Sequence, residues 1–92
     1  MVTVTFAKPV TLGGKKVSKV DLDFDKITGM ELLSAEKHAR DMGDTTPSLA
    51  LSMTYQALVA SKVLGVPYDD VVALPAKAFT AMTLEVGRFL LD

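Results

Sequence analysis

Histidine is the side chain best suited to general acid–base catalysis near neutral pH, and this 92-residue sequence has only one, His38. On a helix, Ser34 and Asp41 lie on the same polar side as His38, which gives the residue types of a catalytic triad. A triad also needs side chains that converge in a pocket beside oxyanion donors, and residues along one open helix do not converge. We therefore interpret His38 as a solvated surface residue and predict that the chain has no catalytic residue and is not an enzyme.

Two further patterns are similar to ligand-binding motifs. Asp21, Asp23 and Asp25 alternate as at the start of a calcium loop, but the glycine and distal glutamate of an EF-hand loop are absent. The alternation is instead typical of the solvent-exposed face of a β-strand. The run from Gly13 to Lys16 lacks the longer frame of a phosphate-binding loop and fits a hairpin turn. We predict neither a metal site nor a cofactor.

Composition excludes several classes of protein. The chain has no cysteine, which excludes disulfides, thiolate catalysis and zinc–thiolate sites. Ten basic residues balance eleven acidic ones, so the net charge of −1 gives no electrostatic footprint for nucleic acid or for an anionic membrane. The uncharged stretch from residue 45 to residue 61 is too short and too polar for a membrane-spanning helix, and residues 1–6 do not form a signal peptide. We expect a single cytoplasmic domain over residues 1–92.

The hydrophobic pattern changes period near residue 25. Residues 1–25 alternate apolar and polar types around Gly13 and Gly14, which predicts an antiparallel β-hairpin. Beyond this point the period is helical and predicts three main helices, with a short helical turn between the second and the third. The expected helices cover residues 28–42, 47–64 and 75–91. The fold class is therefore α+β, with the N-terminal hairpin packed on a small helical bundle.

Caps and breakers set the expected ends of these helices. Thr28 and Glu31 have the spacing of a capping box at the start of the first helix. Pro47 after Thr46 suits the first position of the second helix, and Gly65 suits its end. In the last helix the spacing of the apolar residues predicts a core stripe: Phe79, Met82, Val86, Phe89 and Leu90.

The helix expected over residues 47–64 has two apolar faces. Its main stripe consists of Leu49, Met53, Ala57, Ala60 and Leu64, and a second apolar patch nearly opposite consists of Leu51, Tyr55 and Leu58. Either this second patch also packs in the core, as in the central helix of a bundle, or it forms a contact surface for a second copy or a partner. The candidate protein-binding residues are Leu51, Tyr55, Leu58, Leu84 and Leu91. Because a small domain buries little apolar area, we expect self-association.

The order of motifs along nearly the whole chain resembles that of one family. A hairpin opens at Phe6 with Pro9 and Gly13, and an uncharged middle helix is followed by the segments 60–67 and 69–75 and by the ending 86–90. This order resembles the small tail assembly chaperones of long-tailed bacteriophages and prophages, the Mu/P2-like tail protein group. The matching motifs consist of structural residues, and none of them is catalytic.

The resemblance implies a virion-assembly function. Proteins of this family bind the long helical tape measure protein, keep it soluble and recruit tail tube protein, and many also exist as a longer frameshifted form. The implied partners are therefore the tape measure protein and the tail tube protein, in the cytoplasm of a bacterial host. The alternative is a small DNA-binding regulator of the winged helix-turn-helix type, which requires lysine and arginine clustered on a recognition helix.

Overall fold

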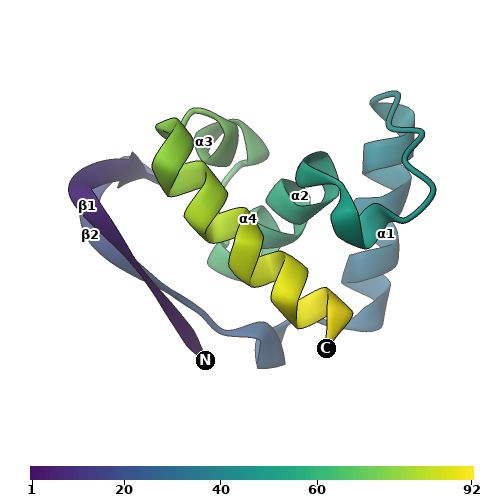
Figure 1. Cartoon of the computed structure of the whole chain (residues 1–92), viewed down its shortest axis with the longest axis horizontal. Coiled ribbons are helices and arrows are strands. Elements are labelled where there is room, and N and C mark those ends of the chain that lie inside the picture. Colours follow the sequence, from purple (N-terminus) through teal and green to yellow (C-terminus); the bar gives the residue numbers. More distant parts are fainter.

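The computed structural model describes all 92 residues and contains a two-stranded antiparallel sheet and four α-helices (Figure 1). Two short 3₁₀ turns, η1 and η2, connect these elements. In chain order the elements are β1 (Val2–Leu12), β2 (Lys15–Leu22), η1 (Phe24–Lys26), α1 (Gly29–Asp41), η2 (Leu49–Leu51), α2 (Met53–Leu64), α3 (Tyr68–Val72) and α4 (Ala76–Leu91). The predicted α+β class, with a hairpin before three main helices, is confirmed. No helix is long and apolar enough to cross a membrane.

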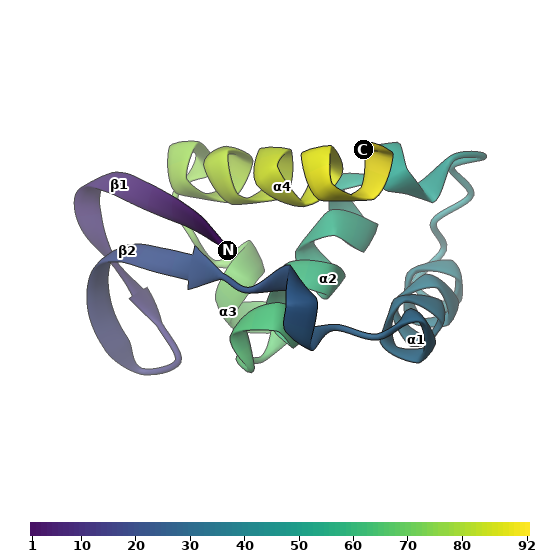
Figure 2. The same ribbon diagram turned by 90° about the horizontal axis from the view of Figure 1, so that it is seen from below.

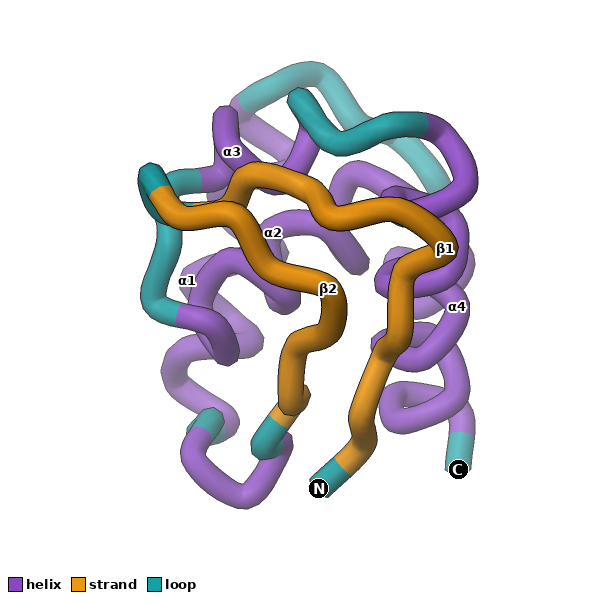
Figure 3. Tube along the Cα trace, turned by 90° about the vertical axis from the view of Figure 1, so that its left-hand side faces the viewer, coloured by secondary structure: helices purple, strands orange, loops and turns teal.

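The hairpin turns at Gly13 and Gly14, whose φ angles are +59° and +79°. Positive φ at both central positions is what a tight two-residue hairpin turn requires, and glycine adopts it without strain. The strands pair from the turn to Val10 and Val17, and again from Thr5 and Lys19 onward. Between these segments four residues of β1 face a single residue of β2. At this irregularity β1 separates from β2 and runs beside α4 (Figure 3).

Helix α1 begins as predicted. The Thr28 hydroxyl accepts a hydrogen bond from the Glu31 amide at 3.3 Å, and the Glu31 carboxylate accepts one from the Thr28 amide at 3.3 Å. This reciprocal pair satisfies two of the amides that a helix start leaves free. The buried face of α1 carries only Ala35 and Ala39, and these small side chains allow α1 to pack on α2.

The second helix begins later than predicted. The sequence predicted a helix over residues 47–64, whereas α2 begins at Met53, and Pro47 lies outside any helix. Ser52 caps α2, because its hydroxyl oxygen accepts a hydrogen bond from the Tyr55 amide at 3.3 Å. The predicted end is correct: Gly65 follows Leu64 with a left-handed φ of +70°.

A polar knot around Asp44 holds the loop before α2 and explains this shift. The Asp44 carboxylate accepts hydrogen bonds from the Ser52 hydroxyl and, at 2.9 Å, from the Thr46 amide. The Arg40 guanidinium donates to the carbonyl oxygens of Asp44 and Thr46 at 3.1 and 2.8 Å. Thr46 is therefore part of the loop instead of capping a helix. The hydrogen bond from Ser52, together with those from Thr46, lowers the pKa of the Asp44 carboxyl from 3.8 to about 2.

The low pKa of Asp44 predicts an acid-sensitive contribution to stability. Because the folded state has the lower pKa, the ionised carboxylate stabilises the fold above about pH 4, and this contribution is lost as the pH falls from about 4 to about 2. We expect Asp44→Asn to show a shallower loss of unfolding free energy than the wild type in this window, measured by urea unfolding at several pH values. Asp41→Asn, which removes an exposed partner of Lys37, is the control. Parallel curves for Asp44→Asn and the wild type would contradict the prediction.

Helix α2 is the centre of the molecule. It packs against α1, α3, α4, η2 and β2, and every residue from Tyr55 to Ser61 is buried. Figure 2 shows α2 between the hairpin at one end and α1 at the other. At the crossing with α4, the Gln56 side chain lies against Gly87 and donates a hydrogen bond to the Ala50 carbonyl at 2.7 Å. This crossing holds η2 beside α4.

Helix α4 follows Pro75 closely, as predicted. Met82 and Val86 of its predicted core stripe are fully buried, and Phe79 and Leu90 are half-buried. Phe89 differs, because it is 37% exposed and stacks on Phe24 with ring centroids 4.3 Å apart. The stripe is therefore core in its middle and peripheral at Phe89.

Candidate functional site

The three residues that could form a triad do not assemble. His38 is exposed, and its nearest aromatic neighbour is Tyr68, with ring centroids 6.4 Å apart. Neither Ser34 nor Asp41 shares a hydrogen bond with it, and the Asp41 carboxylate instead accepts one from Lys37 at 3.3 Å. The geometry of a nucleophile, a base and an orienting acid is therefore not present at His38.

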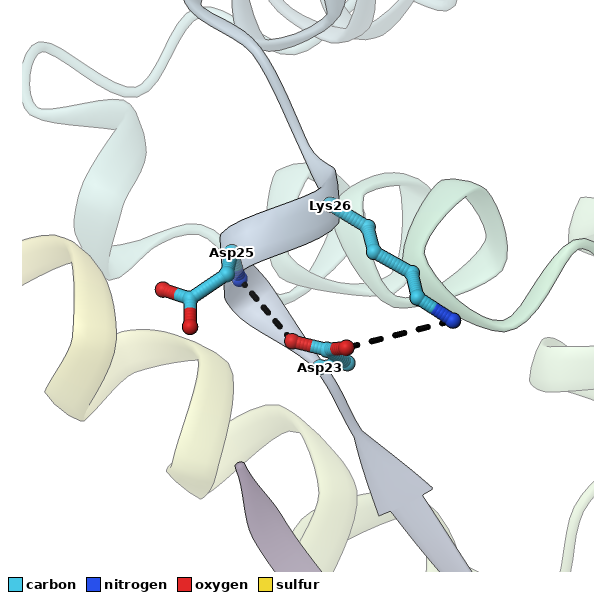
Figure 4. A network of polar contacts seen from close by, with 3 residues as sticks. All are labelled: Asp23, Asp25 and Lys26. Carbon is cyan, nitrogen blue, oxygen red and sulfur yellow. Dashed lines mark hydrogen bonds and ion pairs between the residues drawn. The ribbon is translucent and has the colours of Figure 1, made fainter.

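Two of the three alternating aspartates, Asp21 and Asp23, have structural partners for their carboxylates. Asp21 accepts a hydrogen bond from the Thr3 hydroxyl of the neighbouring strand at 2.7 Å. Asp23 accepts one from the Asp25 amide at 3.2 Å and lies 3.9 Å from the Lys26 ammonium, so it caps η1 (Figure 4). No group of three or more His, Cys, Asp or Glu side chains is placed to hold a metal ion. Asp21 therefore joins the two strands, and Asp23 fixes the turn between β2 and α1.

Two of the five predicted binding residues belong to the core. Tyr55 is 8% exposed and Leu58 is 2% exposed. The Tyr55 hydroxyl donates to the Leu32 carbonyl at 3.3 Å, and burial raises the pKa of this tyrosine. The prediction of a contact surface at these positions is wrong, because α2 is covered on both apolar sides by its neighbours. The alternative reading of the second patch as core is correct for them.

The other three predicted residues are exposed. Leu51, Leu84 and Leu91 expose 63%, 53% and 61% of their surface. Leu84 and Leu91 lie three residues before and four residues after Gly87, so both are on the side of α4 that carries Gly87. Since η2 packs against α4 there, and the bond from Gln56 holds the Ala50 carbonyl at this crossing, Leu51 lies at the same junction.

Two methionines extend this apolar surface. Met42 and Met53 are 46% and 53% exposed and, together with Leu51, line an open hollow of about 530 Å³ in front of the Asp44 loop. The sequence placed Met53 in the core stripe of the second helix, but α2 begins at Met53, and this first residue is exposed. We call the surface formed by Met42, Leu51, Met53, Leu84 and Leu91 the leucine–methionine face.

The leucine–methionine face is suited to binding an apolar side of another polypeptide. Leucines at helical spacing provide a ridge along α4, and methionine adapts to irregular apolar partners. Arg88, between the two leucines of α4, is paired with Glu85 at 3.0 Å, so it adds little free charge. The face carries no group able to do covalent chemistry, and what it offers is apolar contact area.

Comparisons of this chain with protein-family models, with curated proteins and with solved structures gave no match.

Proposed function

We propose that this protein is a phage tail assembly chaperone that binds a helical segment of the tape measure protein on its leucine–methionine face and promotes assembly of the tail tube. The observation that carries the proposal is this face, where three leucines and two methionines each expose 46–63% of their surface. A fold of 92 residues gains nothing from leaving such residues in water.

The family resemblance supports the same function from an independent direction. It rests on the order of structural motifs along nearly the whole chain, whereas the face rests on burial. A chaperone for a long amphipathic client needs apolar contact area, and it needs neither a cofactor nor a nucleophile. We propose that the protein acts in the cytoplasm of the bacterial host, where tails assemble. Tail tube protein is its second proposed partner.

Co-expression with the long helical protein encoded downstream tests this function. We expect the client to become more soluble and to co-purify with the chaperone. Leu51→Asp combined with Leu84→Asp should weaken the complex by at least about 30-fold, because a charge in the centre of an apolar contact costs on the order of 2 kcal/mol or more. His38→Ala should leave the complex intact.

A matched control separates the leucine–methionine face from apolar exposure in general. Met30 on α1 is 80% exposed and lies outside the face, so Met30→Asp should leave the complex unchanged. Failure of the client to co-purify, or equal weakening by Met30→Asp and by the double variant, would contradict the proposed function.

A further inference from the structure

A second hollow lies between the irregular part of β1 and the first turns of α4. Its volume is about 670 Å³, and residues 5–10 and 75–78 line it together with Ala81. It forms where β1 leaves β2, because the residues between Thr5 and Val10 outnumber their partners four to one. In Figure 3 this stretch of β1 passes next to α4. The hollow is therefore a consequence of the strand irregularity, and it is separate from the leucine–methionine face.

About half of the residues that line this hollow are hydrophobic, and part of its rim is rigid. Phe6, Val10 and Ala78 contribute buried side chains to it, and Pro9 and Pro75 form part of its rim. Proline has a fixed φ, so these two positions lose little conformational freedom when a ligand binds. A preformed apolar site of this size accepts one or two apolar side chains.

All the charge at the hollow is positive. Lys8 and Lys77, one from each wall, are the only charged residues that line it. Both are exposed, and neither forms an ion pair within the chain. The acidic group beside the hollow is Asp70 of α3, which lines a neighbouring hollow that shares Pro9, Val10 and Pro75 with this one. Its carboxylate accepts a hydrogen bond from the Gly13 amide at 3.0 Å and pairs with neither lysine.

We propose that this hollow binds a peptide segment of a partner protein in which an apolar side chain is flanked by aspartate or glutamate. The apolar side chain fills the space over Phe6 and Ala78, and the carboxylates pair with Lys8 and Lys77. The β1 residues between Thr5 and Val10 have no register partner in β2, so an extended segment finds backbone groups there. If the proposed function is correct, this segment belongs to the tape measure protein. The chemistry of the segment is inferred from the hollow alone and does not depend on the proposed function.

Two synthetic peptides test this site without the client. Both have twelve residues and the same leucine and alanine positions, and the flanking residues are glutamate in one and lysine in the other. We expect fluorescence anisotropy at low salt to show that the glutamate peptide binds at least about tenfold more tightly than the lysine peptide. Added salt should reduce this difference, because exposed charge pairs are screened.

Charge reversal at the hollow provides the decisive variant. Lys8→Glu combined with Lys77→Glu should abolish or reverse the preference for the glutamate peptide, with an unchanged circular dichroism spectrum. Lys26→Glu with Lys37→Glu makes the same change in net charge at exposed positions that do not line the hollow and should keep the preference. Equal effects of the two double variants, or no binding of the glutamate peptide, would overturn the proposal.

Two further outcomes separate this proposal from others. If the glutamate peptide binds but the client does not co-purify, only the proposed function fails; if the client co-purifies and the peptide does not bind, only this site fails. A change of oligomeric state on reversal of Lys8 and Lys77, without peptide binding, would replace the peptide by a second copy of the chain as the occupant.

Discussion

Leu58→Asp is expected to unfold the protein. Leu58 is 2% exposed at the centre of α2, where α1, α3 and α4 all pack. A carboxylate there has no partner charge, and burying it costs several kcal/mol. A domain of this size has a free energy of unfolding on the order of 5–10 kcal/mol. We expect loss of the helical circular dichroism signal at 25 °C, or a much less stable fold in which the new carboxyl group is protonated.

The matched control for this prediction is Leu51→Asp. Leu51 is 63% exposed, so the same substitution should keep the helical signal and change the unfolding free energy by less than about 1 kcal/mol. If the chain self-associates through the leucine–methionine face, light scattering should show Leu51→Asp shifted toward monomer. A folded Leu58→Asp with wild-type stability would contradict the central position of α2.

The sequence predicted those elements whose signals are local. The hairpin follows from period-two alternation around two glycines, and the start of α1 follows from Thr28 and Glu31, which contact each other three residues apart. The end of α2 at Gly65 and the start of α4 after Pro75 likewise depend on single residues. In each case the atoms that decide the structure are neighbours in the chain.

The start of α2 could not be predicted in this way. Thr46 and Pro47 are residue types that favour a helix start. The loop conformation forms instead, because the Asp44 carboxylate accepts a hydrogen bond from Ser52, eight residues away. Arg40, on the preceding helix, holds the same loop through carbonyl oxygens. A pattern search has no means of comparing such a loop with a helical turn, because the energies depend on side chains brought together by the fold.

The sequence predicted the three leucines of the leucine–methionine face but neither of its methionines, and it added two residues that are buried. A helical wheel shows that α2 has two apolar sides, but it does not show how many neighbours cover them. Tyr55 and Leu58 are covered, whereas Leu51 lies before the helix, in η2, and stays exposed. The contact between Gln56 and Gly87, which places η2 beside α4, has no signature in the sequence because a polar residue inside a helix is usually read as exposed.

The DNA-binding alternative has one observation in its favour. Residues 1–20 carry four lysines and no acidic residue, so the hairpin is locally basic. A winged helix-turn-helix protein also needs basic residues on a recognition helix. On α4, Lys77 and Arg88 lie three turns apart and Arg88 is paired with Glu85, while Arg40 of α1 binds the loop before α2. This distribution favours the protein-binding function.

Met82→Ala is expected to destabilise the protein much more than Phe89→Ala, although both residues belong to the stripe predicted as core. Met82 is fully buried, and truncating a buried methionine costs about 2–5 kcal/mol from lost transfer energy and the cavity left behind. In a domain of about 90 residues this corresponds to a fall in Tm of about 10 °C or more. Urea and thermal unfolding measure both quantities.

Phe89 should contribute less because its environment is different. It is 37% exposed, and its main contact is the stacked ring of Phe24, with an interplanar angle of 5°. An aromatic pair of this kind is worth about 0.5–1.5 kcal/mol beyond its buried area, so Phe89→Ala should cost about 1–2 kcal/mol. Phe24→Ala in the Phe89→Ala background should then add less than it does in the wild type, because the stacking is already lost. Equal destabilisation by Phe89→Ala and Met82→Ala would mean that the C-terminal end of α4 is covered, which would remove Leu91 from the leucine–methionine face and weaken the case for a client helix there.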